Sequence, residues 1–198
     1  MIYWLVYYTT KFVFFFFVPH RIYGRQNMPE KGGFILACNH ASNLDPMLMG
    51  IVPTRRVSFF AKAELFKNSI LGWVLRGCDA FPVRRGRPDI GALKESVRRL
   101  RSGRPLVFFP QGTRSANGNS KRVFPGVGFL AGKSGVPVVP VFISGSDRAL
   151  PRGAKFPRRV PIRIYVGHPV HFPPETSYED ISHSVMDHIH ALAPTRDG

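Results

Sequence analysis

Short apolar runs alternate with amphipathic segments along most of the chain, and this alternation is what most constrains the fold. The runs that have the length and composition of buried strands cover residues 34–38, 57–61, 80–83, 106–109, 136–143 and 162–166. The segments between them with helical periodicity cover residues 43–52, 64–76, 88–101, 126–134 and 178–192. Strands that alternate with helices predict an α/β domain, with a mixed, largely parallel β-sheet flanked by helices. A chain of 198 residues is long enough for one such domain.

Residues 88–101 form the clearest of the expected amphipathic helices. Ile90, Leu93, Val97 and Leu100 recur at helical spacing, so we expect them to share one buried face. Proline-rich and arginine-rich residues between the last two strands predict a surface loop.

The N-terminal run IYWLVYYTTKFVFFFFV, residues 2–18, is apolar and aromatic on nearly every face. As a helix it would be about 25 Å long, at ~1.5 Å per residue, which is marginal for crossing a bilayer. Its flanking residues lack the pattern of a signal peptide. Its composition favours a hydrophobic helix at a membrane interface, although a buried core helix is the alternative.

We therefore divide the chain into an N-terminal hydrophobic membrane-attachment segment, residues 1–22, and a globular domain, residues 23–198. Basic residues follow the apolar run, and positive charge is enriched on the cytoplasmic side of membrane segments. The sequence thus predicts a membrane-associated protein whose globular domain lies on the cytoplasmic face.

The charge of the chain is strongly unbalanced. It has 28 Lys and Arg against 12 Asp and Glu, a net charge of +16. This excess predicts an anionic partner, such as a nucleic acid, a phospholipid surface or a phosphorylated substrate. No nucleic-acid-binding signature is present, and the aromatic residues are concentrated in the N-terminal run and the expected strands rather than among the arginines. A phospholipid membrane or a phosphorylated substrate is therefore favoured over a nucleic acid.

Two cysteines, Cys38 and Cys78, allow at most one disulfide and have no metal-ligand spacing. They indicate a reducing compartment, and we expect no metal and no cofactor. Cys38 is next but one to a histidine, but a small apolar strand residue is favoured over a Cys/His nucleophile. The later histidines His183, His188 and His190 are expected on a solvated or partly packed helix face.

Polar segments follow the apolar runs at three points, and in α/β folds such strand ends carry the chemistry. The first is CNHASNLDPM, residues 38–47, with a histidine and, five residues later, a carboxylate. The others are FPVRRG, residues 81–86, and FFPQGTRS, residues 108–115. The first segment fits either a polar turn that caps the next helix or a catalytic base with an orienting acid. Each segment alone is a weak signal.

In this order and spacing, the segments resemble the glycerolipid acyltransferase family, the PlsC-like enzymes best known as 1-acylglycerol-3-phosphate acyltransferases. The family block N-H-x-S-x-x-D is matched in full by Asn39, His40, Ser42 and Asp45. The block F-P-E-G-T-R-S is matched by residues 109–115, except for one position. A proline-punctuated strand, VPVVPV at residues 136–141, corresponds to a further block. The resemblance extends from about residue 24 to residue 167.

The sequence departs from the family pattern at two positions. Gln111 stands where the family has glutamate, and Arg84 replaces the aspartate of a Val/Ile-Asp-Arg block whose Val83 and Arg85 match. Glutamine keeps the shape and the hydrogen-bonding capacity of glutamate but loses its charge. These departures concern the identity of the acceptor more than the reaction.

The resemblance implies a role for each site residue. His40 is implied as the general base and Asp45 as the residue that orients it. The pKa of histidine suits a general base near neutral pH. The implied acceptor-binding residues are Arg85, Gln111, Gly112, Thr113 and Arg114. The substrate alcohol is the nucleophile, and the donor is acyl-CoA or an acyl-carrier protein, as a co-substrate.

The reaction implied by the resemblance is the transfer of a fatty acyl group to the free hydroxyl of a lysophospholipid. The favoured acceptor is 1-acylglycerol-3-phosphate, giving phosphatidic acid in phospholipid biosynthesis. An acyltransferase for another lysolipid and a non-catalytic membrane- or anion-binding relative are the alternatives.

Overall fold

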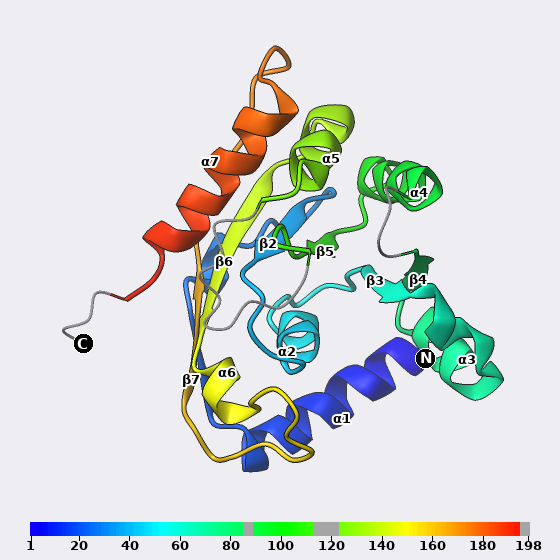
Figure 1. Ribbon diagram of the computed structural model, residues 1–198, viewed down its shortest axis with the longest axis vertical. Coiled ribbons are helices and arrows are strands. Elements are labelled where there is room, and N and C mark those ends of the chain that lie inside the picture. Colours follow the sequence, from blue (N-terminus) through cyan, green and yellow to red (C-terminus); the bar gives the residue numbers. More distant parts are fainter. Residues whose placement is uncertain (85–88, 113–122, 195–198) are drawn as a thin grey trace.

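The computed structural model describes residues 1–84, 89–112 and 123–194. Within them, five strands form a sheet in the order β1-β7-β6-β2-β5 (Figure 1). Their bounds are β1 His20–Tyr23, β7 Ile162–Val166, β6 Val138–Ser144, β2 Ile35–Cys38 and β5 Leu106–Phe108. Of the neighbouring pairs only β6 and β7 are antiparallel. The predicted mixed, largely parallel sheet is confirmed.

A second, two-stranded parallel sheet pairs β3 (Phe59–Lys62) with β4 (Ala80–Val83). A single bridge between Ser58 and Leu106 joins it to the edge of the larger sheet at β5. The two sheets therefore continue one another, and β3 and β4 extend the molecule on the side of β5.

Helices cover both faces of the larger sheet (Figure 1). Their bounds are α1 Ile2–Phe17, α2 Asp45–Ile51, α3 Ser69–Gly77, α4 Ile90–Arg101, α5 Gly126–Ser134, α6 Ser146–Ala149 and α7 Tyr178–Ala191. Two short 3₁₀ helices, η1 Arg25–Asn27 and η2 Ala63–Lys67, complete the elements. α5 and α7 pack on one face together with α4, while α1 and α2 pack on the other.

β2 lies in the middle of this arrangement and is buried on both faces. Ile35 and Ala37 face the core beneath α5 and α7, whereas Leu36 and Cys38 face the core beneath α1 and α2. This alternation follows from the two-residue period of a strand, and burial on both faces explains why the segment reads as a continuous apolar run. The chain leaves the end of β2 directly into the first candidate motif.

Two local features, β1 and the exposure of Ile90, differ from the sequence predictions. β1 was not predicted, and the division at residues 22/23 falls inside this strand, which pairs in parallel with β7. The helical pieces expected over residues 64–76 are η2 and α3, and they are separate because the Asn68 side chain accepts a hydrogen bond from the amide of Leu71 (2.9 Å) and starts α3. The burial predicted for Ile90 is wrong: it is 65% exposed, at the first turn of α4.

α1 has two different faces. Tyr3, Tyr7 and Phe14 point inward and are buried in the core that α1 shares with α2. Large apolar side chains point outward and are exposed: Trp4, Leu5, Tyr8, Phe12, Val13, Phe15, Phe16 and Phe17. Across the described parts of the chain, no helix has both the length and the apolar character needed to cross a bilayer. Core packing therefore accounts for the inner face, and membrane association stays a prediction for the outer one.

Candidate active site

The carboxyl ends of three parallel neighbours, β2, β5 and β6, converge at one edge of the sheet (Figure 1). The segment after β2 carries His40 and Asp45, and the segment after β5 carries Phe109 and Gln111. α6 follows β6 at the same edge. This is the edge at which open α/β sheets place their ligands.

His40 and Asp45 form a direct pair. Nδ1 of His40 lies 2.8 Å from Oδ2 of Asp45, and since a carboxylate only accepts, Nδ1 carries the hydrogen. Oδ2 also accepts the amides of Ala41 and Ser42, each at 2.7 Å. Asp45 is the first residue of α2 and its side chain is fully buried, whereas that of His40 is 12% exposed. Two backbone amides thus hold the carboxylate, which in turn holds the imidazole.

The other polar residues of the N-H-x-S-x-x-D motif attach this turn to distant elements. The Asn39 amide exchanges two hydrogen bonds with the backbone of Ile143 in β6, donating at 2.9 Å and accepting at 2.7 Å. The Ser42 hydroxyl donates to the carbonyl of Leu150, directly after α6 (3.0 Å). The sequence prediction gave these two residues no role of their own, and the structure shows that they fix the base-bearing turn against β6 and α6.

The segment after β5 contacts His40 from the other side. The phenyl ring of Phe109 stacks on the imidazole, with ring centroids 4.3 Å apart and planes inclined by 26°. Oε1 of Gln111, which is buried, accepts a hydrogen bond from the backbone amide of His40 (2.9 Å). Sequence reasoning missed the contact between Phe109 and His40, although Phe109 is the first residue of the segment that matches F-P-E-G-T-R-S. Gln111, predicted as an acceptor-binding residue, contacts the base-bearing turn.

Gly112 adopts a left-handed conformation (φ +69°), and a Cβ there would lie 2.8 Å from the ring of Phe124. Both the backbone angle and the close ring therefore favour glycine. The remaining predicted acceptor-binding residues, Arg85, Thr113 and Arg114, lie outside the described residues. Arg84 is exposed, and its amide donates to Oδ2 of Asp89 (2.9 Å).

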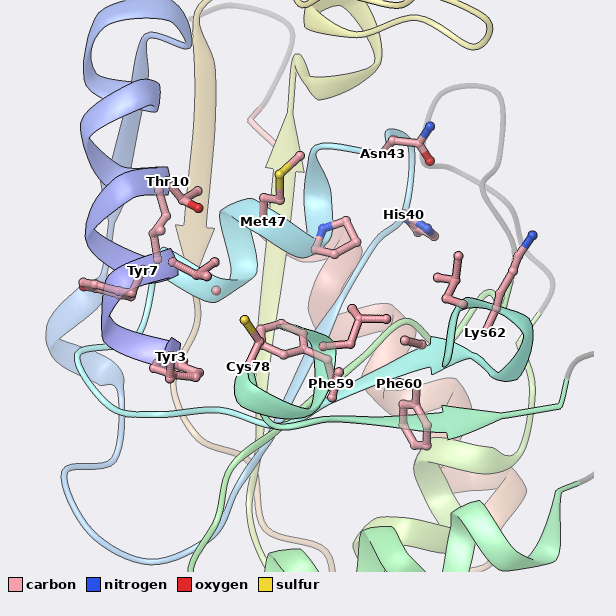
Figure 2. A pocket seen from close by; sticks show the side chains of 18 of the residues that line it. Tyr3, Tyr7, Thr10, His40, Asn43, Met47, Phe59, Phe60, Lys62 and Cys78 are labelled. Atoms are coloured by element: carbon pink, nitrogen blue, oxygen red, sulfur yellow. The ribbon is translucent and has the colours of Figure 1, made fainter. Parts of the chain in front are cut away.

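A cavity of about 560 Å³ begins at His40 and runs between α1, α2 and the β3–β4 region (Figure 2). Its walls are mostly apolar and include side chains from four regions: Tyr3, Val6 and Tyr7 of α1, Met47 and Ile51 of α2, Phe59 and Phe60 of β3, and Leu75 and Cys78 at the end of α3. Lys62 and Arg152 contribute the basic side chains of the lining. The size lies within the range of about 300–1,000 Å³ that is usual for small-molecule sites.

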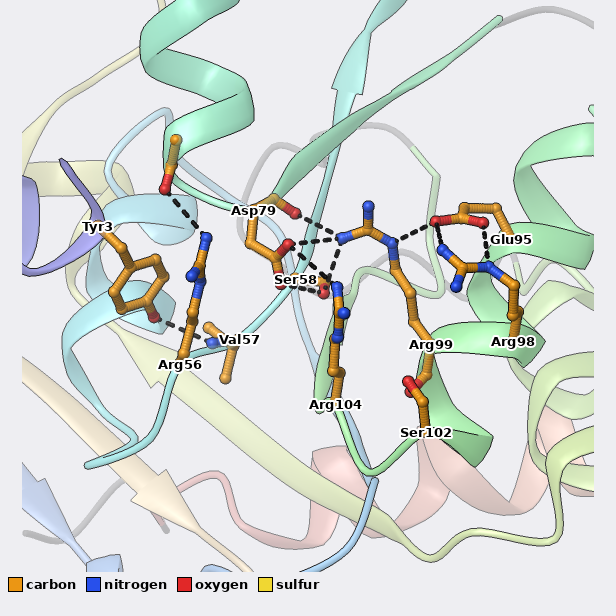
Figure 3. A network of polar contacts seen from close by, with 11 residues as sticks. Tyr3, Arg56, Val57, Ser58, Asp79, Glu95, Arg98, Arg99, Ser102 and Arg104 are labelled. Carbon is orange, nitrogen blue, oxygen red and sulfur yellow. Dashed lines mark hydrogen bonds and ion pairs between the residues drawn. The ribbon is translucent and has the colours of Figure 1, made fainter. Parts of the chain in front are cut away.

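A polar cluster fixes the side of this cavity that β3 and β4 form (Figure 3). Asp79, buried and at φ +64°, accepts hydrogen bonds from the Ser58 hydroxyl (2.8 Å) and the Arg99 guanidinium (2.9 Å). Arg99 also pairs with Glu95 (2.7 Å) and lies over the ring of Phe81. Hydrogen bonds from Arg98 and then Arg99 lower the pKa of Glu95 to about 2. The cluster connects β3, β4 and α4.

The cysteines and the late histidines lie outside this chemistry. Burial raises the pKa of the Cys38 thiol well above its usual range, so Cys38 is a thiol that packs in the core, as a small strand residue was expected to do. Both cysteines are free. His183 and His188 are exposed on α7 and His190 is half-buried, which confirms the solvated or partly packed face.

A histidine held by a buried carboxylate at a strand end, beside an apolar cavity, is the kind of site that transfers an acyl group to an alcohol by base catalysis. The sequence model of the family described as Acyltransferase matches residues 20–144. The chain belongs to this acyltransferase family, among its PlsC-like glycerolipid members, and is an enzyme.

Relatives with curated names agree with this assignment. A 1-acyl-sn-glycerol-3-phosphate acyltransferase of Bacillus subtilis is 28% identical over 76% of this chain and 73% of its own length. One from Streptococcus pneumoniae is 36% identical over 57% of this chain, and a chloroplastic one from Arabidopsis thaliana 28% over 78%; the matches cover 42% and 44% of those proteins. The chain thus spans less than half of the latter two.

The fold is that of a solved acyltransferase. The crystal structure of PlsC, the 1-acyl-sn-glycerophosphate acyltransferase from Thermotoga maritima, superposes with a TM-score of 0.79 at 24% identity. The match covers 98% of this chain and 80% of the other. The predicted α/β fold is therefore confirmed, and the family model confirms the predicted family.

Proposed function

We propose that the protein transfers a fatty acyl group from an acyl thioester to the free hydroxyl of 1-acylglycerol-3-phosphate and so forms phosphatidic acid. The observation that carries the proposal is the His40–Asp45 pair at one end of an apolar cavity, in a chain of the acyltransferase family. The printed names of the curated relatives support the acceptor.

The chain's own residues suffice for the proton transfers. With Nδ1 held by Asp45, Nε2 of His40 removes the proton of the acceptor hydroxyl as its oxygen attacks the thioester carbonyl. The carbon–oxygen ester bond forms, the carbon–sulfur bond breaks, and the imidazolium returns the proton to the leaving thiolate. The buried Asp45 carboxylate stabilises the imidazolium between these two steps, and the ring of Phe109 limits tilting of the imidazole.

The cavity suits the acyl chain of a substrate. Its apolar walls begin at His40, so a chain that enters it leaves its carboxyl end beside the base. Lys62 and Arg152 line the same space and offer positive charge to the phosphates that both acyl-CoA and an acyl-carrier protein's prosthetic arm carry. The transfer assay described below distinguishes acyl-CoA from acyl-carrier protein as the donor.

The acceptor phosphate is assigned to Arg114, with Arg85 as a second cation. The support is the match of residues 112–115 to the family block, together with a net charge of +16. A guanidinium binds a phosphate in a bidentate manner that an amine cannot reproduce. Because Gln111 stands where the family has glutamate, a different lysolipid is the alternative acceptor.

The membrane is the proposed location, with the globular domain on the cytoplasmic face. The support is the outer face of α1, where Leu5, Tyr8, Phe12 and Phe15 are each more than 60% exposed. A lysophospholipid acceptor with a long acyl chain resides in that membrane, so attachment there brings enzyme and acceptor together.

The test is transfer of a labelled acyl group by the purified full chain, with acyl-CoA or acyl-carrier protein as donor and a panel of phosphorylated and unphosphorylated lysolipids. His40→Ala is expected to lower the rate by about two or more orders of magnitude, while His183→Ala, on the exposed face of α7, is the matched control and stays near normal. Near-normal transfer by folded His40→Ala contradicts the mechanism.

The assignment of Arg114 to the acceptor phosphate is tested separately. Arg114→Ala should raise KM for the phosphorylated acceptor and leave KM for the donor unchanged, and Arg114→Lys should restore part of the loss. An equal loss with phosphorylated and unphosphorylated acceptors would mean that Arg114 only maintains the loop. Failure of the unsubstituted chain to acylate any lysolipid would favour a non-catalytic relative.

A further inference from the structure

α3 presents an apolar face that its own domain leaves uncovered. Ile70 is 75% exposed, Trp73 61% and Leu71 41%. The opposite side of the same helix, at Gly72, is buried. Large apolar residues gathered on the solvent side of a nine-residue helix are typical of a surface that contacts a partner.

α3 lies directly beside the start of α1. The end of α3 abuts the start of α1, since a Cβ on Gly77 would lie 2.6 Å from the Ile2 side chain. Arg56 joins the two ends: its guanidinium lies over the ring of Tyr3 and donates to the carbonyl of Gly77 (3.2 Å), and Figure 3 shows it beside Tyr3. The two helices are therefore held in a fixed relation.

The same two helices form two walls of the cavity. Tyr3, Val6 and Tyr7 line it from α1, and Leu65 and Leu75 line it from η2 and α3 (Figure 2). Their inner faces thus contact the proposed acyl-chain site, while their outer faces are apolar and exposed. The partner of the outer faces lies directly beside the cavity.

Composition identifies a bilayer surface as this partner. The only two tryptophans of the chain are Trp4 on α1 and Trp73 on α3, and tryptophan is enriched at the level of lipid headgroups. The exposed charged residues of η2 and α3 are Lys67 and Arg76 against one acid, Glu64, a positive balance that suits anionic lipid. A second copy of the same chain would bring these like charges together.

We propose that α3 is a second membrane contact, which inserts its Ile70, Leu71 and Trp73 side chains at the bilayer interface next to α1. This inference deepens the membrane attachment proposed above and rests on it. One interfacial helix fixes only a line, about which the domain can roll. A second contact beside that line fixes a plane, and with it the direction in which the cavity and His40 face the lipid.

The two tryptophans allow a direct test on the full chain. W4F leaves Trp73 as the sole reporter on α3, and W73F leaves Trp4 as the matched reporter on α1. Vesicles of phosphatidylcholine and phosphatidylglycerol are added, with and without phosphatidylcholine brominated on its acyl chains. In W4F the Trp73 emission is expected to shift to shorter wavelength and to be quenched by the brominated lipid, as in W73F.

Each other result overturns the proposal. If Trp4 is quenched in W73F but Trp73 is neither shifted nor quenched in W4F, only α1 contacts lipid and the proposed function stands. If neither is quenched, the membrane attachment itself fails, whereas transfer to a short-chain, water-soluble lysophospholipid still tests the reaction. If Trp73 shifts with protein concentration in the absence of vesicles, a second copy covers the face.

A substitution gives an independent readout. Ile70→Asn combined with Trp73→Asn should lower the partition coefficient into these vesicles by about tenfold or more, since two large apolar side chains no longer enter the interface. Transfer to the water-soluble acceptor should not change. Ile90→Asn, at a comparably exposed isoleucine of α4, is the control and should leave partitioning unchanged. Unchanged partitioning of the double variant would contradict the proposal.

Discussion

Asp45→Asn separates the structural from the catalytic contribution of the carboxylate. Oδ2 of Asp45 accepts three hydrogen bonds, from Nδ1 of His40 and from the amides of Ala41 and Ser42. A hydrogen bond to a charged group contributes about 1 kcal/mol more than a neutral one, so neutralising the acceptor of three bonds should cost about 3 kcal/mol of folding free energy. Oδ1 is buried and unpaired within the described residues, so an amide nitrogen in its place would find no acceptor there and would add to this cost.

Asp45→Asn should reduce turnover more severely than it reduces stability. A neutral amide does not stabilise the imidazolium that forms when His40 takes the hydroxyl proton, so turnover should fall by about two to four orders of magnitude. His40→Ala should lose a similar amount of turnover but less stability, because Asp45 then retains the amides of Ala41 and Ser42.

Urea unfolding and acyl transfer on the same preparations measure the two effects. Asp187→Asn, which neutralises an exposed aspartate on α7, is the matched control and should change neither. Turnover of Asp45→Asn within about threefold of the unsubstituted chain, with unfolding free energies that differ by less than about 0.5 kcal/mol, would refute the reasoning for both contributions.

Three further substitutions test other parts of the structure. Tyr3→Phe removes the acceptor of the buried Val57 amide (3.0 Å) and should cost about 1–3 kcal/mol in urea unfolding. Burial raises the pKa of Tyr3 to about 12, so the unsubstituted chain should lose stability between pH 10 and 12, where Tyr3 ionises first in the unfolded chain. Tyr3→Phe should lack this part of the pH dependence. Gln111→Leu leaves the His40 amide without its acceptor, so kcat should fall while KM for the donor holds, and Gln111→Glu should retain kcat. Arg99→Met removes the main cation beside buried Asp79 and should lower the unfolding free energy by about 3 kcal/mol, with an unchanged value arguing that Arg104, 3.8 Å from Asp79, replaces it.

Strands with apolar, β-branched or aromatic residues were located from the sequence, including β4 and β7, which are partly exposed. β2, with all four residues buried, and β6, with six of seven, are continuous apolar runs and were readily predicted. β1 was not, because HRIY is short and has alternating half-buried and exposed residues at the edge of the sheet. Local pattern therefore located the other strands of the sheet and the His40 turn, but not the edge strand β1.

The tertiary partners of the site were beyond the reach of local pattern. Ser42 and Leu150 are 108 residues apart, and only the parallel arrangement of β2 and β6 brings them within hydrogen-bonding distance. The proximity of His40 and Asp45 was foreseeable, because five residues separate them across a strand end and a helix start. Tyr3 and Tyr7 were assigned to a membrane segment, and their four-residue spacing on one helical face was the signal that they also pack inward.

α1 is at once an outer surface and an inner wall, and this has a consequence for protein engineering. The helix that carries Phe12 and Phe15 outward also carries Tyr3, Val6 and Tyr7 into the cavity beside His40. A chimaera whose first seventeen residues are replaced by those of another protein would have a different cavity wall as well as a different membrane anchor. Its preference among acyl chains is therefore expected to change together with its membrane location.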